Sequence, residues 1–98
     1  MNKIDLRDYI NELYDLYGQL LTGKQQDIIE KYYFYNLSLK EISEELKISR
    51  TAVLDSLKHA CDNLIYYEEK VRLFTKIKNI ENMNIPKEYL DEILKELK

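Results

Sequence analysis

SLKEISEELKISRTAVLDSLKHA, residues 38–60, decides the fold of this 98-residue chain. Two helix start signals stand inside it. Ser38 and Glu41 match the S-x-x-E capping box, in which the serine side chain accepts from the glutamate N–H and the glutamate side chain reaches back. Ser49 is a second candidate N-cap, and only Lys47 and Ile48 separate it from the first helix. A connection this short favours two helices that cross steeply.

Five apolar side chains are spaced to fill the corner between these helices: Ile42, Leu46, Ile48, Val53 and Leu57. This arrangement is the helix-turn-helix, whose second helix can enter the major groove of DNA. Lys47 occupies the turn position where glycine usually supplies a positive φ. Keeping that conformation at a lysine costs about 1 kcal/mol, which the fold can tolerate.

The run E-I-x-x-x-L-x-I-S-x-x-x-V, residues 41–53, resembles region 4 of bacterial sigma factors. A wider likeness, over residues 13–74, is to the YlxM family of small bacterial helix-turn-helix proteins. It is carried by Leu20, Leu21, Thr22, Lys24, Gln25, Tyr32, Tyr33, Ser38, Leu39, Glu41, Ile42, Ile48, Ser49, Arg50, Ala52, Val53, Asp55, Lys58, Tyr67 and Glu68. The resemblance implies an all-helical protein that serves the signal recognition particle pathway, with the particle's RNA or its GTPase as partner.

The bulk composition is typical of a globular chain, with 45% hydrophobic and 34% charged residues. The length predicts one domain over residues 1–98, comprising the motif at 38–60 and a C-terminal helical extension at 61–98. No apolar run is long enough for a membrane span, and the start of the chain lacks the features of a signal peptide. A single cysteine suits a reducing compartment, so we expect a cytoplasmic protein.

Helices are predicted on both sides of the motif. Apolar residues recur at three-to-four spacing over residues 6–21, which indicates a first amphipathic helix. Thr22 and Gln25 form the capping box of a second helix that buries Ile28 and Ile29. The aromatic run at residues 32–35 is typical of core or subunit contacts, and stacking on unpaired bases is the alternative.

The second motif helix is predicted to be long, because no helix breaker occurs between Arg50 and Pro86. Its apolar residues from Val53 to Phe74 follow a near-heptad spacing, with Glu68 expected on a solvated flank. A terminal amphipathic helix follows Pro86, which brings the expected total to about five. The near-heptad apolar residues from Val53 to Phe74 form a seam, and those of the terminal helix form a stripe. Both apolar surfaces need a partner to cover them, which predicts a homodimer.

Candidate nucleic-acid contacts lie on the side of the motif that faces away from the corner. Arg50 and Lys58 can meet bases or phosphates, and a serine or threonine at a helix start can bind phosphate. The alternative is that Ser49 is only a cap and that the charges form a solvated helix face. The predicted contact set is Lys40, Lys47, Ser49, Arg50, Thr51, Leu54, Asp55 and Lys58.

The net charge of −3 opposes the nucleic-acid reading, because phosphate neutralisation supplies much of the affinity of such proteins. Arg50 and Lys58 are offset by Asp55 and Asp62. Two other functions therefore stay open: a protein-binding adaptor that keeps the fold without specific DNA binding, and a protein that binds structured RNA.

Catalysis and metal binding are not predicted. The one histidine and the one cysteine, His59 and Cys61, are two residues apart and so fall on different faces of a helix. They form neither a nucleophile–base pair nor a metal site. We expect no cofactor and no enzymatic activity.

Overall fold

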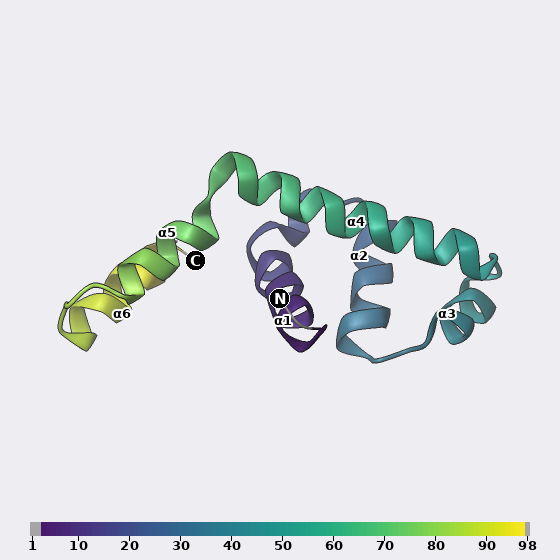
Figure 1. Cartoon of the computed structure of the whole chain (residues 1–98), viewed down its shortest axis with the longest axis horizontal. Coiled ribbons are helices and arrows are strands. Elements are labelled where there is room, and N and C mark those ends of the chain that lie inside the picture. Colours follow the sequence, from purple (N-terminus) through teal and green to yellow (C-terminus); the bar gives the residue numbers. More distant parts are fainter. Residues whose placement is uncertain (1–2, 98) are drawn as a thin grey trace.

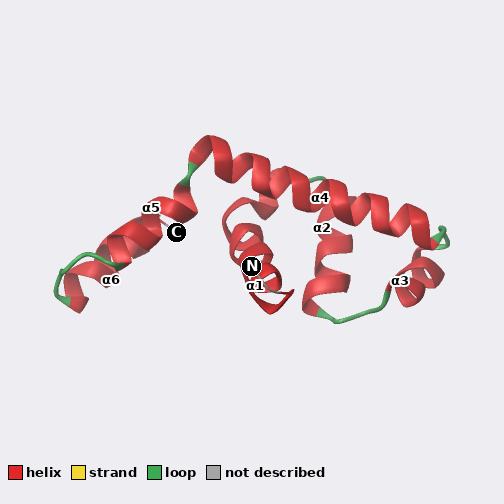
Figure 2. Ribbon diagram, in the orientation of Figure 1, coloured by secondary structure: helices red, strands yellow, loops and turns green. Residues whose placement is uncertain are grey.

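The computed structural model describes residues 3–97, with side chains from residue 6 onward. Six α-helices and no strand occur within this range (Figures 1 and 2), which confirms the all-α class. They are α1 (Lys3–Tyr17), α2 (Gly23–Ile29), α3 (Leu39–Leu46), α4 (Arg50–Val71), α5 (Leu73–Glu81) and α6 (Lys87–Leu97). A 3-10 turn, η1 (Gly18–Leu20), follows α1, and a π-helical turn, η2 (Glu30–Phe34), follows α2. None of these helices is both long and apolar enough to cross a bilayer.

Helix α4 is the spine of the molecule (Figure 1). Helices α1, α2 and α3 lie along one side of it, and a hairpin of α5 and α6 projects from its C-terminal end. The chain is elongated, with principal extents of 50 × 23 × 21 Å. The motif of α3 and the start of α4 therefore stands at the opposite end of the spine from the hairpin.

The core forms where α1, α2 and α4 meet. Ile28 and Ile29 of α2 are fully buried, as the sequence predicts, and they pack with residues of α1 and α4. Leu64 of α4 is also fully buried. The first helix is shorter than predicted: it ends at Tyr17, and the chain turns through η1, where Leu20 is exposed.

Arg7 holds the end of η2 against α1. Its Nη1 donates to the backbone oxygen of Tyr33 at 2.8 Å and to Asn36 Oδ1 at 3.0 Å. Its guanidinium also lies 5.2 Å from the centroid of the Tyr33 ring. Asn36, two residues after the end of η2, has a φ of 56°, and this left-handed conformation turns the chain out of the helical path.

The predicted unbroken helix after Arg50 is wrong. The helix ends at Val71, because Arg72 adopts a left-handed conformation with a φ of 57°, and α5 starts at the next residue. The near-heptad seam therefore does not continue straight through the bend. Val71, predicted to be part of it, is 48% exposed.

The bend is held by Glu68, which the sequence wrongly places on a solvated flank. Its side chain is buried and accepts from the hydroxyl of Tyr17 at 2.7 Å. It also accepts from the backbone N–H of Phe74 and from both the N–H and the hydroxyl of Thr75, at 2.8–3.1 Å. The first N–H groups of a helix have no partner inside it, so this carboxylate caps α5.

The protonation of Glu68 reflects this cap. Burial by itself raises the pKa of the carboxyl group, but the hydrogen bonds from Tyr17, Thr75 and the start of α5 outweigh it and lower the pKa below its ordinary value. The Tyr17 hydroxyl in turn accepts from the N–H of Leu73 at 3.1 Å. One carboxylate and one phenol thus join α1, α4 and α5.

The terminal helix keeps part of its apolar face exposed. Helix α6 packs against α5 as a hairpin, and no described residue of α6 is buried. Tyr89 is 57% and Ile93 40% exposed. The stripe that the sequence predicts after Pro86 therefore exists, and it is only partly covered within this chain: Leu90, Leu94 and Leu97 are half-buried.

Candidate nucleic-acid interface

Helix α3 begins at the predicted capping box. Ser38 Oγ accepts from the N–H of Glu41 at 3.0 Å, and Glu41 Oε1 accepts from the N–H of Ser38 at 3.0 Å. The bonds with Ser38 lower the pKa of the Glu41 carboxyl group. This reciprocal pair fixes the first residue of α3 and thus the direction in which Lys40 leaves the backbone.

The turn between α3 and α4 has the predicted left-handed residue. Lys47 has a φ of 59° and a ψ of 42°, and its N–H donates to the oxygen of Ser43, as does the N–H of Ile48 at 3.1 Å. Ser43 is buried with its hydroxyl donating to the oxygen of Lys40 at 2.7 Å. The turn thus accommodates a lysine at the left-handed position, and Lys47 is exposed.

Helix α4 begins at Ser49, whose Oγ accepts from the N–H of Ala52 at 3.0 Å. The capping interpretation of Ser49 is confirmed. This bond uses an acceptor lone pair, so the hydroxyl hydrogen can still be donated to an incoming oxygen. The cap and a phosphate contact are compatible at this residue.

The corner residues separate into an interior and an exterior. Ile42 and Val53 are fully buried and Leu57 is 6% exposed, whereas Leu46 and Ile48 are half-buried, so three of the five predicted corner residues form its interior. All eight predicted contact residues are exposed: Lys40, Lys47, Ser49, Arg50, Thr51, Leu54, Asp55 and Lys58.

The exposed residues come from three consecutive segments. Lys40 is on α3 and Lys47 is in the turn, while Arg50, Leu54 and Lys58 follow one another at i, i+4 and i+8 along α4. Residues four apart lie above one another on a helix, so these last three form one stripe. Within the part of the chain that the structure describes, none of the four cations is in an ion pair.

An ion pair joins α3 to η2. Lys31 Nζ lies 2.9 Å from Asp27 Oδ1 and 3.1 Å from Glu45 Oε1. These bonds raise the pKa of the Lys31 ammonium group. Glu45 of α3 therefore pairs with a lysine of η2.

One exposed pair outside the motif escaped the sequence reasoning. Lys70 Nζ lies 5.4 Å from the ring centroid of Tyr66, and both residues are exposed on α4. The i, i+4 spacing of an aromatic residue and a cation was the available signal. This pair lies toward the other end of α4 from the stripe.

Comparison with known proteins finds one family over nearly the whole chain. The sequence model described as "Putative helix-turn-helix protein, YlxM / p13 like" matches residues 4–97. A UPF0122 protein of Caldanaerobacter subterraneus is 54% identical over 68 residues, which cover 69% of this chain and 58% of that protein. One from a Thermoanaerobacter species is 49% identical over 74 residues, 76% of this chain and 63% of its own length.

A third similar protein matches a larger share of the chain. The UPF0122 protein of Lactococcus lactis subsp. cremoris is 40% identical over 93 residues, which cover 95% of this chain and 78% of that protein. The chain thus spans about three fifths of the length of the first two relatives and more of the third.

Proposed function

Because the chain belongs to the YlxM / p13-like helix-turn-helix family, we propose that it is a nucleic-acid-binding regulatory or accessory protein without enzymatic activity. The observation that carries the proposal is the exterior of the α3–α4 corner. Four exposed cations lie there, and none is in an ion pair within residues 3–97.

The stripe on α4 supplies the base contacts in this proposal. Arg50, in the first turn, can donate two hydrogen bonds to the O6 and N7 atoms of a guanine. Leu54 is 51% exposed and can contact a thymine methyl group, while Asp55 can accept from a cytosine amino group. Direct readout would thus come from three residues within two turns of the helix start.

Phosphate contacts would come from both motif helices and the turn between them. Lys40, Lys47 and Lys58 supply charge, and the hydroxyls of Ser49 and Thr51 can donate to phosphate oxygens. Each neutralised phosphate adds about 0.9 to the slope of log affinity against log salt. With only a handful of such contacts, we expect duplex affinity weaker than about 1 µM at physiological salt.

A homodimer is part of this proposal. Tyr89 and Ile93 on the hairpin are exposed apolar side chains that a second copy could cover. Two motifs related by a two-fold axis would read half-sites about one helical turn apart, which compensates for weak single sites. Sedimentation or light scattering at micromolar concentration tests the oligomeric state directly.

The family resemblance extends the proposal to the signal recognition particle pathway, in the cytoplasm, where the free Cys61 would stay reduced. The nucleic acid would then be the particle's RNA, with its GTPase as a further partner. The net charge of −3 favours a second candidate, a protein-binding adaptor that keeps the fold without specific DNA contact.

The test is a titration of labelled duplex DNA, particle RNA and the particle's GTPase against the parent chain and two variants. Arg50→Glu should weaken nucleic-acid binding about tenfold or more, with an unchanged melting temperature. Lys24→Glu is the matched control, since Lys24 is exposed on α2 outside the motif. Equal binding by all three proteins would refute contact through α4, and tight binding to the GTPase alone would favour the adaptor.

A further inference from the structure

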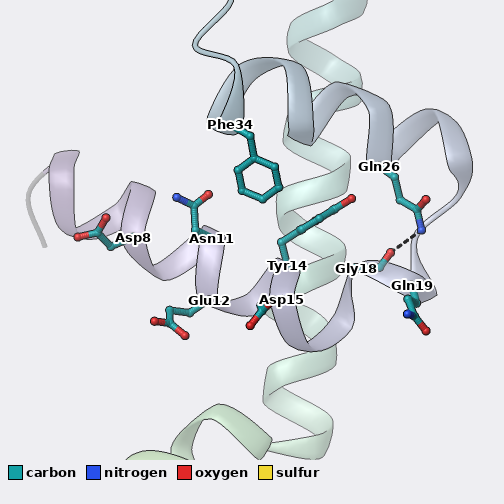
Figure 3. Close-up of a pocket in the computed structure, with 9 residues that line it drawn as sticks. All are labelled: Asp8, Asn11, Glu12, Tyr14, Asp15, Gly18, Gln19, Gln26 and Phe34. Atoms are coloured by element: carbon teal, nitrogen blue, oxygen red, sulfur yellow. Dashed lines mark hydrogen bonds between the residues drawn. The ribbon is translucent and has the colours of Figure 1, made fainter. Parts of the chain in front are cut away.

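A hollow of about 670 Å³ opens between α1 and the α2–η2 segment (Figure 3). Helix α4 passes behind these segments in this view, so the hollow faces away from the spine. Its volume is in the range of about 300–1,000 Å³ that is usual for ligand sites. None of the eight proposed nucleic-acid contacts lines it.

Aromatic rings form one wall of the hollow. The rings of Tyr14 and Phe34 meet edge to face, with their centroids 5.2 Å apart, and Phe34 is 43% exposed. The Tyr14 hydroxyl donates to Glu30 Oε2 at 2.5 Å, which fixes its ring. Gly18 leaves room for this ring, because a Cβ there would lie 3.0 Å from Tyr14 Cε2 and the ring would have to shift slightly.

An unused acceptor lies beside these rings. Asn11 Oδ1 is buried and has no hydrogen-bond partner, although it lines the hollow next to Phe34 (Figure 3). A buried acceptor without a donor destabilises the chain until a donor reaches it. Because this oxygen is closed to solvent, a ligand N–H group can reach it only when the Asn11 side chain turns toward the hollow, and that turn would supply the missing hydrogen bond.

The remaining wall is acidic. Asp8, Glu12 and Asp15 follow the i, i+4, i+7 spacing on α1, so their carboxylates lie on one stripe, and all three are exposed. No lysine, arginine or histidine is among the described residues that line the hollow. The site therefore attracts cations and repels the phosphates of nucleic acid.

We propose that this hollow binds an arginine side chain presented by a partner protein. A guanidinium is planar and can lie on the exposed Phe34 ring, while its five N–H groups can serve a carboxylate and Asn11 Oδ1 together. An ammonium group is a point charge and does not match the flat aromatic wall as well. A guanidinium thus matches the aromatic wall, the Asn11 oxygen and the acidic wall of the hollow.

The length of the acidic stripe favours a peptide segment over a free small cation. Seven residues of helix separate Asp8 from Asp15, which is about 10 Å. An extended chain places alternate side chains about 7 Å apart on one side, so a second basic residue can reach the far carboxylate. The site is independent of the proposed nucleic-acid stripe and adds a protein-binding surface to the chain.

The probe is a fluorescein-labelled peptide, Gly-Arg-Gly-Arg-Gly, compared with a peptide that carries neutral citrulline at both arginines. Titration of the full chain at low salt should give a dissociation constant below about 1 mM for the arginine peptide only. Backbone amide shifts in a ¹⁵N spectrum should fall on α1 and η2. Equal binding of the citrulline peptide, or shifts confined to other helices, would overturn the proposal.

Two variants locate the site. The triple variant Asp8→Asn, Glu12→Gln, Asp15→Asn should bind the peptide about tenfold more weakly. Its control, Asp62→Asn, Glu69→Gln, Asp91→Asn, has the same net charge and neutralises exposed acids elsewhere, so it should bind like the parent. An equal loss in both would mean general charge attraction and would refute a site.

Asn11→Leu tests the acceptor at nearly constant volume. It should weaken peptide binding and leave the chain at least as stable, because an unsatisfied buried oxygen is removed. Spermidine that competes as well as the peptide would refute the arginine assignment. Arg50→Glu should bind the peptide like the parent, which separates this site from the nucleic-acid proposal.

Discussion

Replacing Glu68 by alanine should be among the most damaging single changes in this chain. The substitution removes the acceptor of four hydrogen bonds, from the Tyr17 hydroxyl, the N–H of Phe74, and the N–H and hydroxyl of Thr75. Each buried donor left without a partner costs about 1–3 kcal/mol, although water entering the bend will satisfy some of them. We expect a total loss of roughly 3 kcal/mol.

Thermal unfolding followed by circular dichroism measures this loss. For a chain of this size, 1 kcal/mol shifts the melting temperature by about 4–8 °C, so Glu68→Ala should lower it by roughly 12–24 °C. Glu69→Ala is the matched control, because Glu69 is the exposed neighbour and should change stability by less than about 0.5 kcal/mol. Equal melting temperatures for the two variants would refute the cap.

The pH dependence provides an independent check on the same residue. The folded chain holds the pKa of Glu68 below its ordinary value, so the stabilisation is complete above the unfolded value of about 4.3. It is lost as the pH falls through the lower folded value. Glu68→Gln should therefore lose less stability than the parent between neutral pH and pH values below about 4.

Three further changes test other parts of the structure. Lys47→Gly should raise the unfolding free energy by up to about 1 kcal/mol in urea titrations, because φ is 59° at this residue; a loss of stability would contradict the turn assignment. Lys58→Ala should lower the slope of log affinity against log salt by about 0.9 for any nucleic acid bound, and an unchanged slope would remove Lys58 from the interface. Ile93→Ser should shift the oligomer toward monomer in light scattering with little change in melting temperature, whereas an unchanged mass would exclude the α6 face as the dimer contact.

The features that could be predicted from the sequence are those with local causes. Capping boxes at Ser38 and Thr22 form between residues three apart in the chain, and both are present. The left-handed residue at Lys47 follows from the position of the turn between two such caps. Local contacts of this kind can be predicted from a short segment of sequence, because no distant residue is needed to form them.

The bend after α4 and the hollow have distant causes. Arg72 adopts a left-handed conformation although it is not a glycine, so its residue type does not mark the bend. Tyr17, the partner that fixes the bend, lies 51 residues from Glu68 in the chain. Arg7 likewise reaches η2 across 26 residues. The predicted contact residues proved to be exposed because the corner packs as expected, but the acidic hollow depends on how α1 meets η2, which periodicity does not specify.

The position of these charges also bears on the net charge of −3. Charges in water are screened over about 8–10 Å at physiological salt, whereas the chain is 50 Å long. Helix α1 packs against α4 away from the end at which α3 meets it (Figure 1), so the acids of α1 do little to weaken the field at the first turns of α4. The net charge of −3 therefore does not exclude a local cationic surface around Arg50 and Lys58, because the acids that line the hollow lie on a different helix. A chain with this charge distribution can contact nucleic acid through α4 and an arginine-bearing protein through α1, which makes the accessory role and the adaptor role compatible in one molecule.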